Sequence, residues 1–188
     1  MCTHFAFKTI QLSVEILDHI FSFLVSHRET LITCSKDRVL SPIVERHLYY
    51  HVIVHFGHET TDDSNYAFKP DCLSKLISKN PRILYYVRIL QIRVEFKDCP
   101  RRKHPYMKLL DEFANTLLMF PVLECIILTY SMDYDMEFPD VFQAALVDRL
   151  SCPTVKELHL EGLGGQRIPF SYLTIPEPFT FRNIWRVH

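Results

Sequence analysis

The chain has 188 residues, 48% of them hydrophobic and 13% aromatic, which is enough for one domain or two small ones with a real core. Its formal net charge of −1 and sequence pI near 6.8 argue against nucleic acid or a membrane surface as a partner, because proteins that bind either usually carry excess positive charge. No apolar run approaches the roughly 18 residues of a membrane span, and the first residues lack the pattern of a signal peptide. We therefore expect a cytoplasmic or nuclear protein whose thiols stay reduced.

The first predicted helix covers residues 12–24, LSVEILDHIFSFL. Ser13 is a suitable N-cap, and Glu15 in the first turn suits the positive end of the helix dipole. At helical spacing the large apolar side chains form two neighbouring rows: Ile16, Ile20 and Leu24 in one, and Leu17, Phe21 and Leu24 in the other. This is more apolar surface than one small core needs, so the helix either packs into its own domain or presents a face to a partner.

Two further short helices are expected before the pattern changes. Ser26 or His27 can cap the second, and Ser41 followed by Pro42 makes a good start for the third, since proline suits the first helical position. From residue 50 the text YHVIVHF is β-branched and aromatic, which is typical of a strand. The helical part should therefore end near residue 49.

The first helix resembles the opening helix of an F-box, whose usual form is Leu-Pro-x-Glu-Ile/Leu-Leu-x-x-Ile-Phe-x-Phe/Tyr-Leu. Eight positions match in order, and Ser13 replaces the usual proline. The matching residues are Leu12, Glu15, Ile16, Leu17, Ile20, Phe21, Phe23 and Leu24. The similarity continues more weakly through residues 30–35, 40–42 and 46–48, whereas residues 36–38 depart from the family, which normally has apolar residues there.

Beyond residue 68 a helix, a proline and a strand-like run recur three times. Helices are expected over residues 70–80, 109–120 and 138–150, and each is followed by one of the runs ILYYVRILQIRVEF, VLECIILTY and VKELHLEGL. Ile126 and Leu128 occupy the same positions after Pro121 as Leu158 and Leu160 do after Pro153. This period is typical of a leucine-rich-repeat solenoid, in which each unit buries its face on the next. A small unrelated α/β domain also alternates helices and strands, and remains the alternative.

The predicted fold class is therefore α/β, with an N-terminal three-helix F-box followed by a short irregular leucine-rich-repeat-like solenoid. We place the F-box at residues 10–49 and the repeat-like domain at residues 50–173. Residues 174–188 contain two prolines and no period, so we expect an irregular tail. The polar, acidic segment 58–68 and the basic run 101–104 are expected to be loops.

The sequence offers little for catalysis or metal binding. His47, His51, His55 and His58 cluster near the end of the helical part, but two of them fall in the strand pattern, where the helical i, i+4 argument for a metal site fails. The six cysteines include no C-x-x-C pair. Glycine-rich phosphate loops, G-x-S-x-G and H-E-x-x-H are missing too. We therefore predict no catalytic residue, no metal and no cofactor.

The F-box resemblance implies the non-catalytic substrate-recognition subunit of a Skp–cullin–F-box ubiquitin ligase. Its partners would be the Skp adaptor, held by the N-terminal helices, and an unidentified protein substrate, held by the repeat-like domain. The expected adaptor-binding residues are Leu12, Ile16, Leu17, Ile20, Phe21, Phe23, Leu24 and Leu31. The alternative is a regulatory or structural α/β interaction protein whose first helix belongs to its own core.

Overall fold

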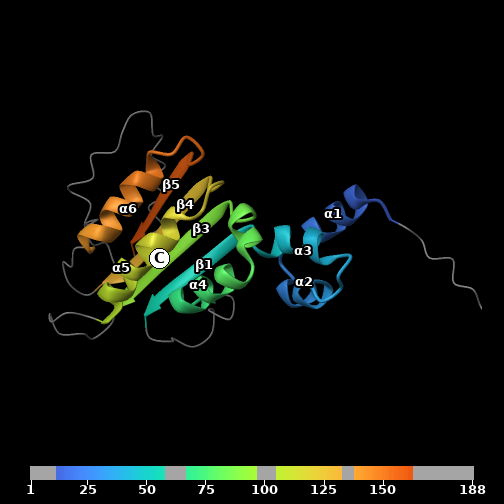
Figure 1. Cartoon of the computed structure of the whole chain (residues 1–188), viewed down its shortest axis with the longest axis horizontal. Helices are drawn as coiled ribbons and strands as arrows, with labels where there is room; N and C mark the ends of the chain where they lie inside the picture. The colour runs from blue at the N-terminus through green and yellow to red at the C-terminus, as the bar shows by residue number, and fades with distance from the viewer. Residues whose placement is uncertain (1–11, 58–66, 97–104, 133–137, 163–188) are drawn as a thin grey trace, which may run out of the picture. The chain divides into compact units, whose positions relative to one another are not determined.

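The computed structural model in Figure 1 describes residues 12–57, 67–96, 105–132 and 138–162. The chain divides into two compact units, Met1–Leu48 and Tyr49–His188. The sequence predicts this division between residues 49 and 50, one residue later than it lies in the structure. The predicted tail at 174–188, the basic run 101–104 and most of the acidic segment 58–68 lie outside the described residues. Within the residues described, no helix is both long and apolar enough to span a membrane.

The first unit contains the helices α1 (Val14–Phe23), α2 (Arg28–Cys34) and α3 (Ser41–Leu48). Ser13 caps α1, because its Oγ accepts a hydrogen bond from the Ile16 amide at 3.4 Å. The buried apolar side chains of the unit come from all three helices: Phe21, Leu31, Ile43, Val44 and Leu48. This small core is what fixes the three short helices, since helices of this length are marginal alone.

Polar contacts hold the turn at residues 36–38 and the end of α3. The Asp37 carboxylate accepts hydrogen bonds from the backbone amides of Val39 at 2.7 Å and Leu40 at 3.3 Å, which makes a tight turn just before α3. The Arg28 side chain of α2 donates to the Leu48 carbonyl at 2.9 Å and so satisfies the end of α3. A charged turn therefore lies at the segment where the sequence departs from the F-box pattern.

In the part of the chain that the structure describes, the second unit is a five-stranded, all-parallel sheet with helices between its strands. The strands lie in the order β2-β1-β3-β4-β5. They are β1 (His51–Gly57), β2 (Ala67–Phe68), β3 (Ile89–Phe96), β4 (Cys125–Met132) and β5 (Glu157–Gly162). The helices are α4 (Pro70–Lys79), α5 (Pro105–Leu118), α6 (Asp140–Leu150) and the short 3₁₀ helix η1 (Pro81–Tyr85).

Two local expectations are corrected here. Ala67 and Phe68, at the end of the predicted loop, form the short edge strand β2 beside β1. The run that starts at Ile83 begins as η1 and becomes a strand only at Ile89. Its first residues, Ile83 and Leu84, are both buried in the core, although they are consecutive. A short apolar run is compatible with a buried helical turn and with a buried strand, so the sequence alone did not distinguish them.

One face of the sheet carries the core. The strand register puts Val52, Leu90, Ile126 and Leu158 in one row, and Val54, Ile92, Leu128 and Leu160 in the next. These side chains form a single cluster with apolar residues of α4, α5 and α6, so all three α-helices pack on this first face. The repeated positions after Pro121 and Pro153 in the sequence are thus neighbours across β4 and β5.

Candidate functional site

Helix α1 has two apolar faces. Leu17, Phe21 and Leu24 point into the helical unit, where Phe21 is only 4% exposed and the other two are half-buried. Ile16, Ile20 and Phe23 follow one another at spacings of four and three residues, which brings them to one side of α1, and Leu12 lies just before the N-cap Ser13. We call these four residues the outer face of α1.

The outer face is well exposed. Leu12, Ile16 and Ile20 are between 41% and 49% exposed, and Phe23 is 69% exposed with its ring 4.8 Å from that of His19. Large apolar side chains are normally scattered singly over a protein surface, so four of them at one helix, three on the same side of it, are the sort of feature that marks an interaction site. Among the described residues, the helical unit exposes four further apolar side chains that the sequence prediction did not include: Val14, Val25, Ile32 and Val39.

The structure separates the eight predicted adaptor-binding residues into groups. Leu12, Ile16, Ile20 and Phe23 are exposed, and Leu17 and Leu24 are half-buried. Phe21 and Leu31, at 4% and 1% exposed, are core residues of the helical unit. These last two therefore shape the outer face through packing, whereas the first four are the ones that solvent, or a partner, can reach.

The orientation of α1 is held by α3. Asp18 accepts a hydrogen bond from Arg46 at 2.9 Å, and its same oxygen lies 2.8 Å from Nε2 of His47. At the start of α1, the Glu15 carboxylate accepts hydrogen bonds from the Glu15 backbone amide and from the Ser13 side chain, and both lower its pKa. This carboxylate therefore stays charged at the positive end of the helix dipole.

The second face of the sheet is built differently from the first. Its residues are the odd-numbered ones of β1, β3, β4 and β5, and many are polar: His51, His55, Gln91, Arg93, Glu95, Cys125, Thr129, Glu157, His159 and Glu161. Several are paired. Gln91 donates to Thr129 at 3.1 Å, and Thr129 donates to Glu161 at 3.0 Å. His55 lies 3.6 Å from Glu95.

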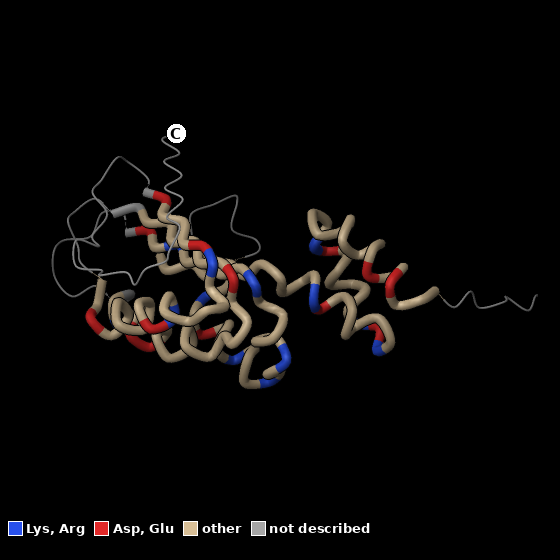
Figure 2. Tube along the Cα trace, turned by 90° about the horizontal axis from the view of Figure 1, so that it is seen from above, with Lys and Arg blue, Asp and Glu red and all other residues tan. Residues whose placement is uncertain are grey.

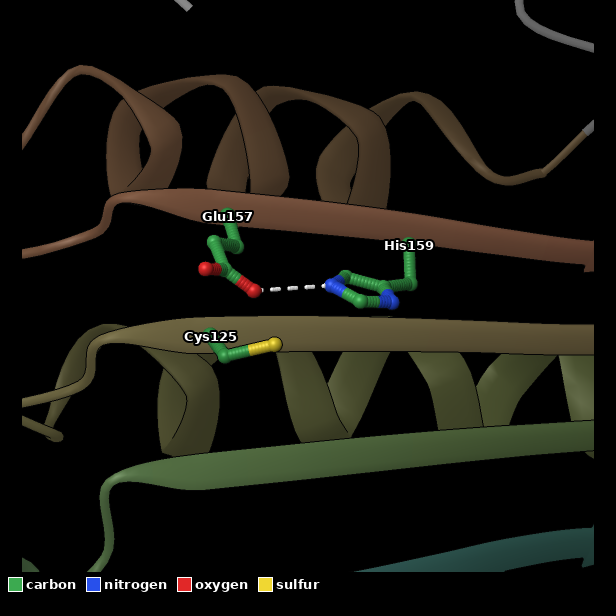
Figure 3. Close-up of side chains that lie close together, drawn as sticks. All are labelled: Cys125, Glu157 and His159. Atoms are coloured by element: carbon green, nitrogen blue, oxygen red, sulfur yellow. Dashed lines mark hydrogen bonds and ion pairs between the residues drawn. The ribbon is translucent and has the colours of Figure 1, made fainter. Parts of the chain in front are cut away.

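Cys125, Glu157 and His159 come together at one end of this second face, as Figure 3 shows. Cys125 on β4 is paired in register with Glu157 on β5, and His159 is two residues further along β5. Nε2 of His159 lies 2.9 Å from Oε2 of Glu157. Burial, together with the negative charge of Glu157, raises the pKa of the Cys125 thiol to about 11.

The histidines singled out in the sequence do not form a corresponding group. His47 contacts Asp18 in the helical unit, whereas His51 and His55 lie on the second face of the sheet, and His58 is outside the described residues. Within the described part of the chain, the one group of three or more metal-ligand residues close together is Cys125, Glu157 and His159. Sequence spacing gave no sign of it, because only the strand register brings residues 125 and 157 together.

Among the described residues, charge of neither sign gathers in one region. Figure 2 shows acidic and basic residues interspersed along both units. Several pair locally, as Arg88 does with Glu124 at 3.1 Å. Comparison of the sequence and structure with protein-family models, curated proteins and solved structures found no match to any of them.

Proposed function

We propose that this chain is an F-box protein, the substrate-recognition subunit of a Skp–cullin–F-box ubiquitin ligase. The outer face of α1 docks on the Skp adaptor, and the sheet unit holds a protein substrate. The observation that carries the proposal is the group of exposed apolar side chains on α1 and just before it, in a segment whose sequence resembles the F-box at eight positions.

The energetics of such docking are favourable. Fully burying a large apolar side chain is worth roughly 1.5–3 kcal/mol, and interface energy concentrates in a few such residues. Ile16 and Ile20 lie one turn apart near the middle of the outer face, with Leu12 and Phe23 at its ends. We therefore expect the two isoleucines to contribute most, because contacts at the centre of an interface are the best shielded from water.

For the second unit, we propose an irregular leucine-rich-repeat-like solenoid. In support, β1, β3, β4 and β5 are parallel neighbours in chain order, and the α-helices between them all join the core on the first face. A solenoid of this kind leaves its strand surface for binding. The substrate would then contact the second face, which carries many polar side chains.

The role proposed for this chain is to bring two reactants close together, without a chemical step of its own. A subunit that holds a substrate beside a ubiquitin-charged enzyme raises the effective concentration of the two reactants, and none of its own side chains needs to react. This role requires two binding surfaces joined in one chain, and the division at Leu48 and Tyr49 supplies two units to carry them.

The alternative is a regulatory or structural protein that uses α1 only within its own core. Burial of Phe21 and half-burial of Leu17 fit both functions, since either needs a folded helical unit. The outer face distinguishes them, because a helix that served its own core alone would have no use for three exposed apolar residues on one side, at Ile16, Ile20 and Phe23.

Co-purification with the Skp adaptor tests the proposal. Ile20→Asp places a charge in the middle of the outer face, and we expect a loss of adaptor binding of about thirtyfold or more, the effect of a hot-spot residue worth about 2 kcal/mol. Ile20 is 41% exposed, so the unit should remain folded.

The matched control is Val141→Asp. Val141 is 56% exposed on α6 of the other unit, so the same charge is introduced at an exposed apolar helical position far from α1 in the sequence. The control should bind the adaptor like the wild type. If Ile20→Asp binds the adaptor as well as the wild type does, or if the wild-type chain does not bind it, the F-box proposal is wrong and the regulatory or structural function is favoured.

A further inference from the structure

The group formed by Cys125, Glu157 and His159 has a simple geometric origin. Residues two apart on a strand project from the same face, and neighbouring parallel strands lie about 4.8 Å apart. Glu157 and His159 are such a pair on β5, and Cys125 is the register partner of Glu157 on β4. Three potential ligands from two rigid strands are thus held on one face without any loop, with one ligand atom from each lying within 4.8 Å of the other two.

The three donor types select one class of metal ion. A thiolate, an imidazole and a carboxylate together suit Zn²⁺, whereas Mg²⁺ and Ca²⁺ prefer oxygen ligands alone. Zinc binds sulfur at about 2.3 Å and nitrogen or oxygen at about 2.0–2.2 Å, so tetrahedral ligands are about 3.3–3.7 Å apart. The present spacing of at most 4.8 Å needs a contraction of about 1 Å, which side-chain rotation can provide.

We propose that Cys125, Glu157 and His159 form a zinc-binding site on the second face of the sheet, with three protein ligands and a fourth position left to water. The site goes beyond the adaptor docking proposed for α1 and shares no residue with it. Its immediate physical effect is to tie β5 to β4 by ligand bonds in addition to the strand pairing.

Access and charge are suited to this role. Cys125 is 9% exposed and the His159 side chain 18%, so the ion would be well shielded, while the 46% exposed side chain of Glu157 gives it a route from solvent. On binding, the Cys125 thiol releases its proton to water and becomes the ligating thiolate. The positive ion also removes the repulsion between that thiolate and Glu157, which disfavours the thiolate in the metal-free protein.

Zinc binding can be measured on the full chain with affinity tags removed and reductant present. We expect uptake of about one equivalent of Zn²⁺ by equilibrium dialysis, and with Co²⁺ as a spectroscopic substitute a sulfur-to-metal charge-transfer absorption. Cys125→Ser and His159→Gln should each weaken Zn²⁺ binding by at least about tenfold, a loss that even outer-shell partners of a metal site can cause. Cys125→Ser should also abolish the charge-transfer band.

Two controls separate this site from adventitious binding. His55→Gln removes a histidine of the same face that also lies beside a glutamate, and Cys152→Ser removes a half-buried cysteine of the same unit. Both should bind Zn²⁺ like the wild type. Glu157→Gln, at a half-exposed side chain, removes a ligand with little risk to folding, and circular dichroism checks that each variant is folded. Absence of stoichiometric uptake by the wild-type chain, absence of the charge-transfer band, or equal losses in His55→Gln and His159→Gln would overturn the proposal.

Discussion

Asp18 of α1 and His47 of α3 meet at 2.8 Å, between Oδ1 of the carboxylate and Nε2 of the imidazole. Arg46 donates to the same oxygen at 2.9 Å, and the His47 ring lies 6.5 Å from that of Phe21, centroid to centroid. One carboxylate and one buried ring therefore fix the rotation of α1 about its own axis. This rotation decides which apolar face of α1 is turned inward and which is left exposed.

Asp18→Asn should weaken the contacts of Asp18 with Arg46 and His47, with little loss of stability. We expect the free energy of unfolding of the helical unit to fall by no more than about 1 kcal/mol, because the Asp18 side chain is 43% exposed and such ion pairs contribute little. Thermal unfolding at low and high salt should show the gap between variant and wild type narrowing with salt. The matched control is Asp71→Asn, which removes an exposed pair with Lys75 on α4. A salt-independent loss would mean that Asp18 acts by some other contact.

Phe21→Ala tests whether the two units fold separately. Deleting a buried phenylalanine ring typically costs about 3–5 kcal/mol, and a unit of this size has little stability to spare. We expect hydrogen exchange, followed by mass spectrometry, to become fast throughout α1, α2 and α3 while β3 and β4 keep their protection. Ile20→Ala, at the exposed neighbour, should change exchange in neither unit. Loss of protection in β3 and β4 as well would show that the sheet depends on the helical unit.

Periodicity predicted the elements of this chain well because their apolar residues are buried on one side. The helical face of residues 70–80 became α4, and the strand pattern of YHVIVHF became β1 with strictly alternating burial. The equivalent positions after Pro121 and Pro153 became cross-strand neighbours. In each case the local pattern and the tertiary environment agree, which is the condition under which sequence reasoning works.

What the sequence did not reveal depends on register and on orientation. The two apolar rows of α1 were visible, but only the contacts of Asp18 and Phe21 decide that Ile16 and Ile20 face outward. The Cys125–Glu157–His159 group requires the register of β4 on β5, which no spacing within the chain encodes. One element boundary was missed after Pro81, because the apolar run that begins at Ile83 fits both the 3₁₀ helix η1 and a strand.

Alkaline stability should depend on Tyr130. Burial raises the pKa of this side chain above its ordinary value of 10.0, so the folded protein keeps a phenolic proton that the unfolded chain loses. Unfolding then releases a proton, and stability falls as the pH rises above about 10. In Tyr130→Phe this contribution is gone, so the urea midpoint should fall less between neutral pH and pH above 10 than it does in the wild type. Tyr85→Phe, at a tyrosine that is 63% exposed, is the control and should follow the wild-type profile.

On the second face of the sheet, the contributions of Gln91 and Thr129 to stability should depend on each other, because their side chains are hydrogen-bonded. Thr129, which is 8% exposed, accepts from the Gln91 amide and donates to Glu161. Thr129→Val leaves the buried amide of Gln91 without this acceptor, which should lower the free energy of unfolding by about 1–3 kcal/mol. Gln91→Leu removes the amide itself and leaves the bond to Glu161 intact, so it should cost less.

The double variant Gln91→Leu with Thr129→Val is the decisive measurement. Both partners are then apolar and no buried amide is left unpaired, so we expect it to be at least as stable as Thr129→Val alone. In a double-mutant cycle from urea unfolding, the two losses should therefore be non-additive by about 0.5–3 kcal/mol. Additive losses would mean that the 3.1 Å contact between the two side chains contributes nothing, and that the second face owes its order to the strand pairing alone.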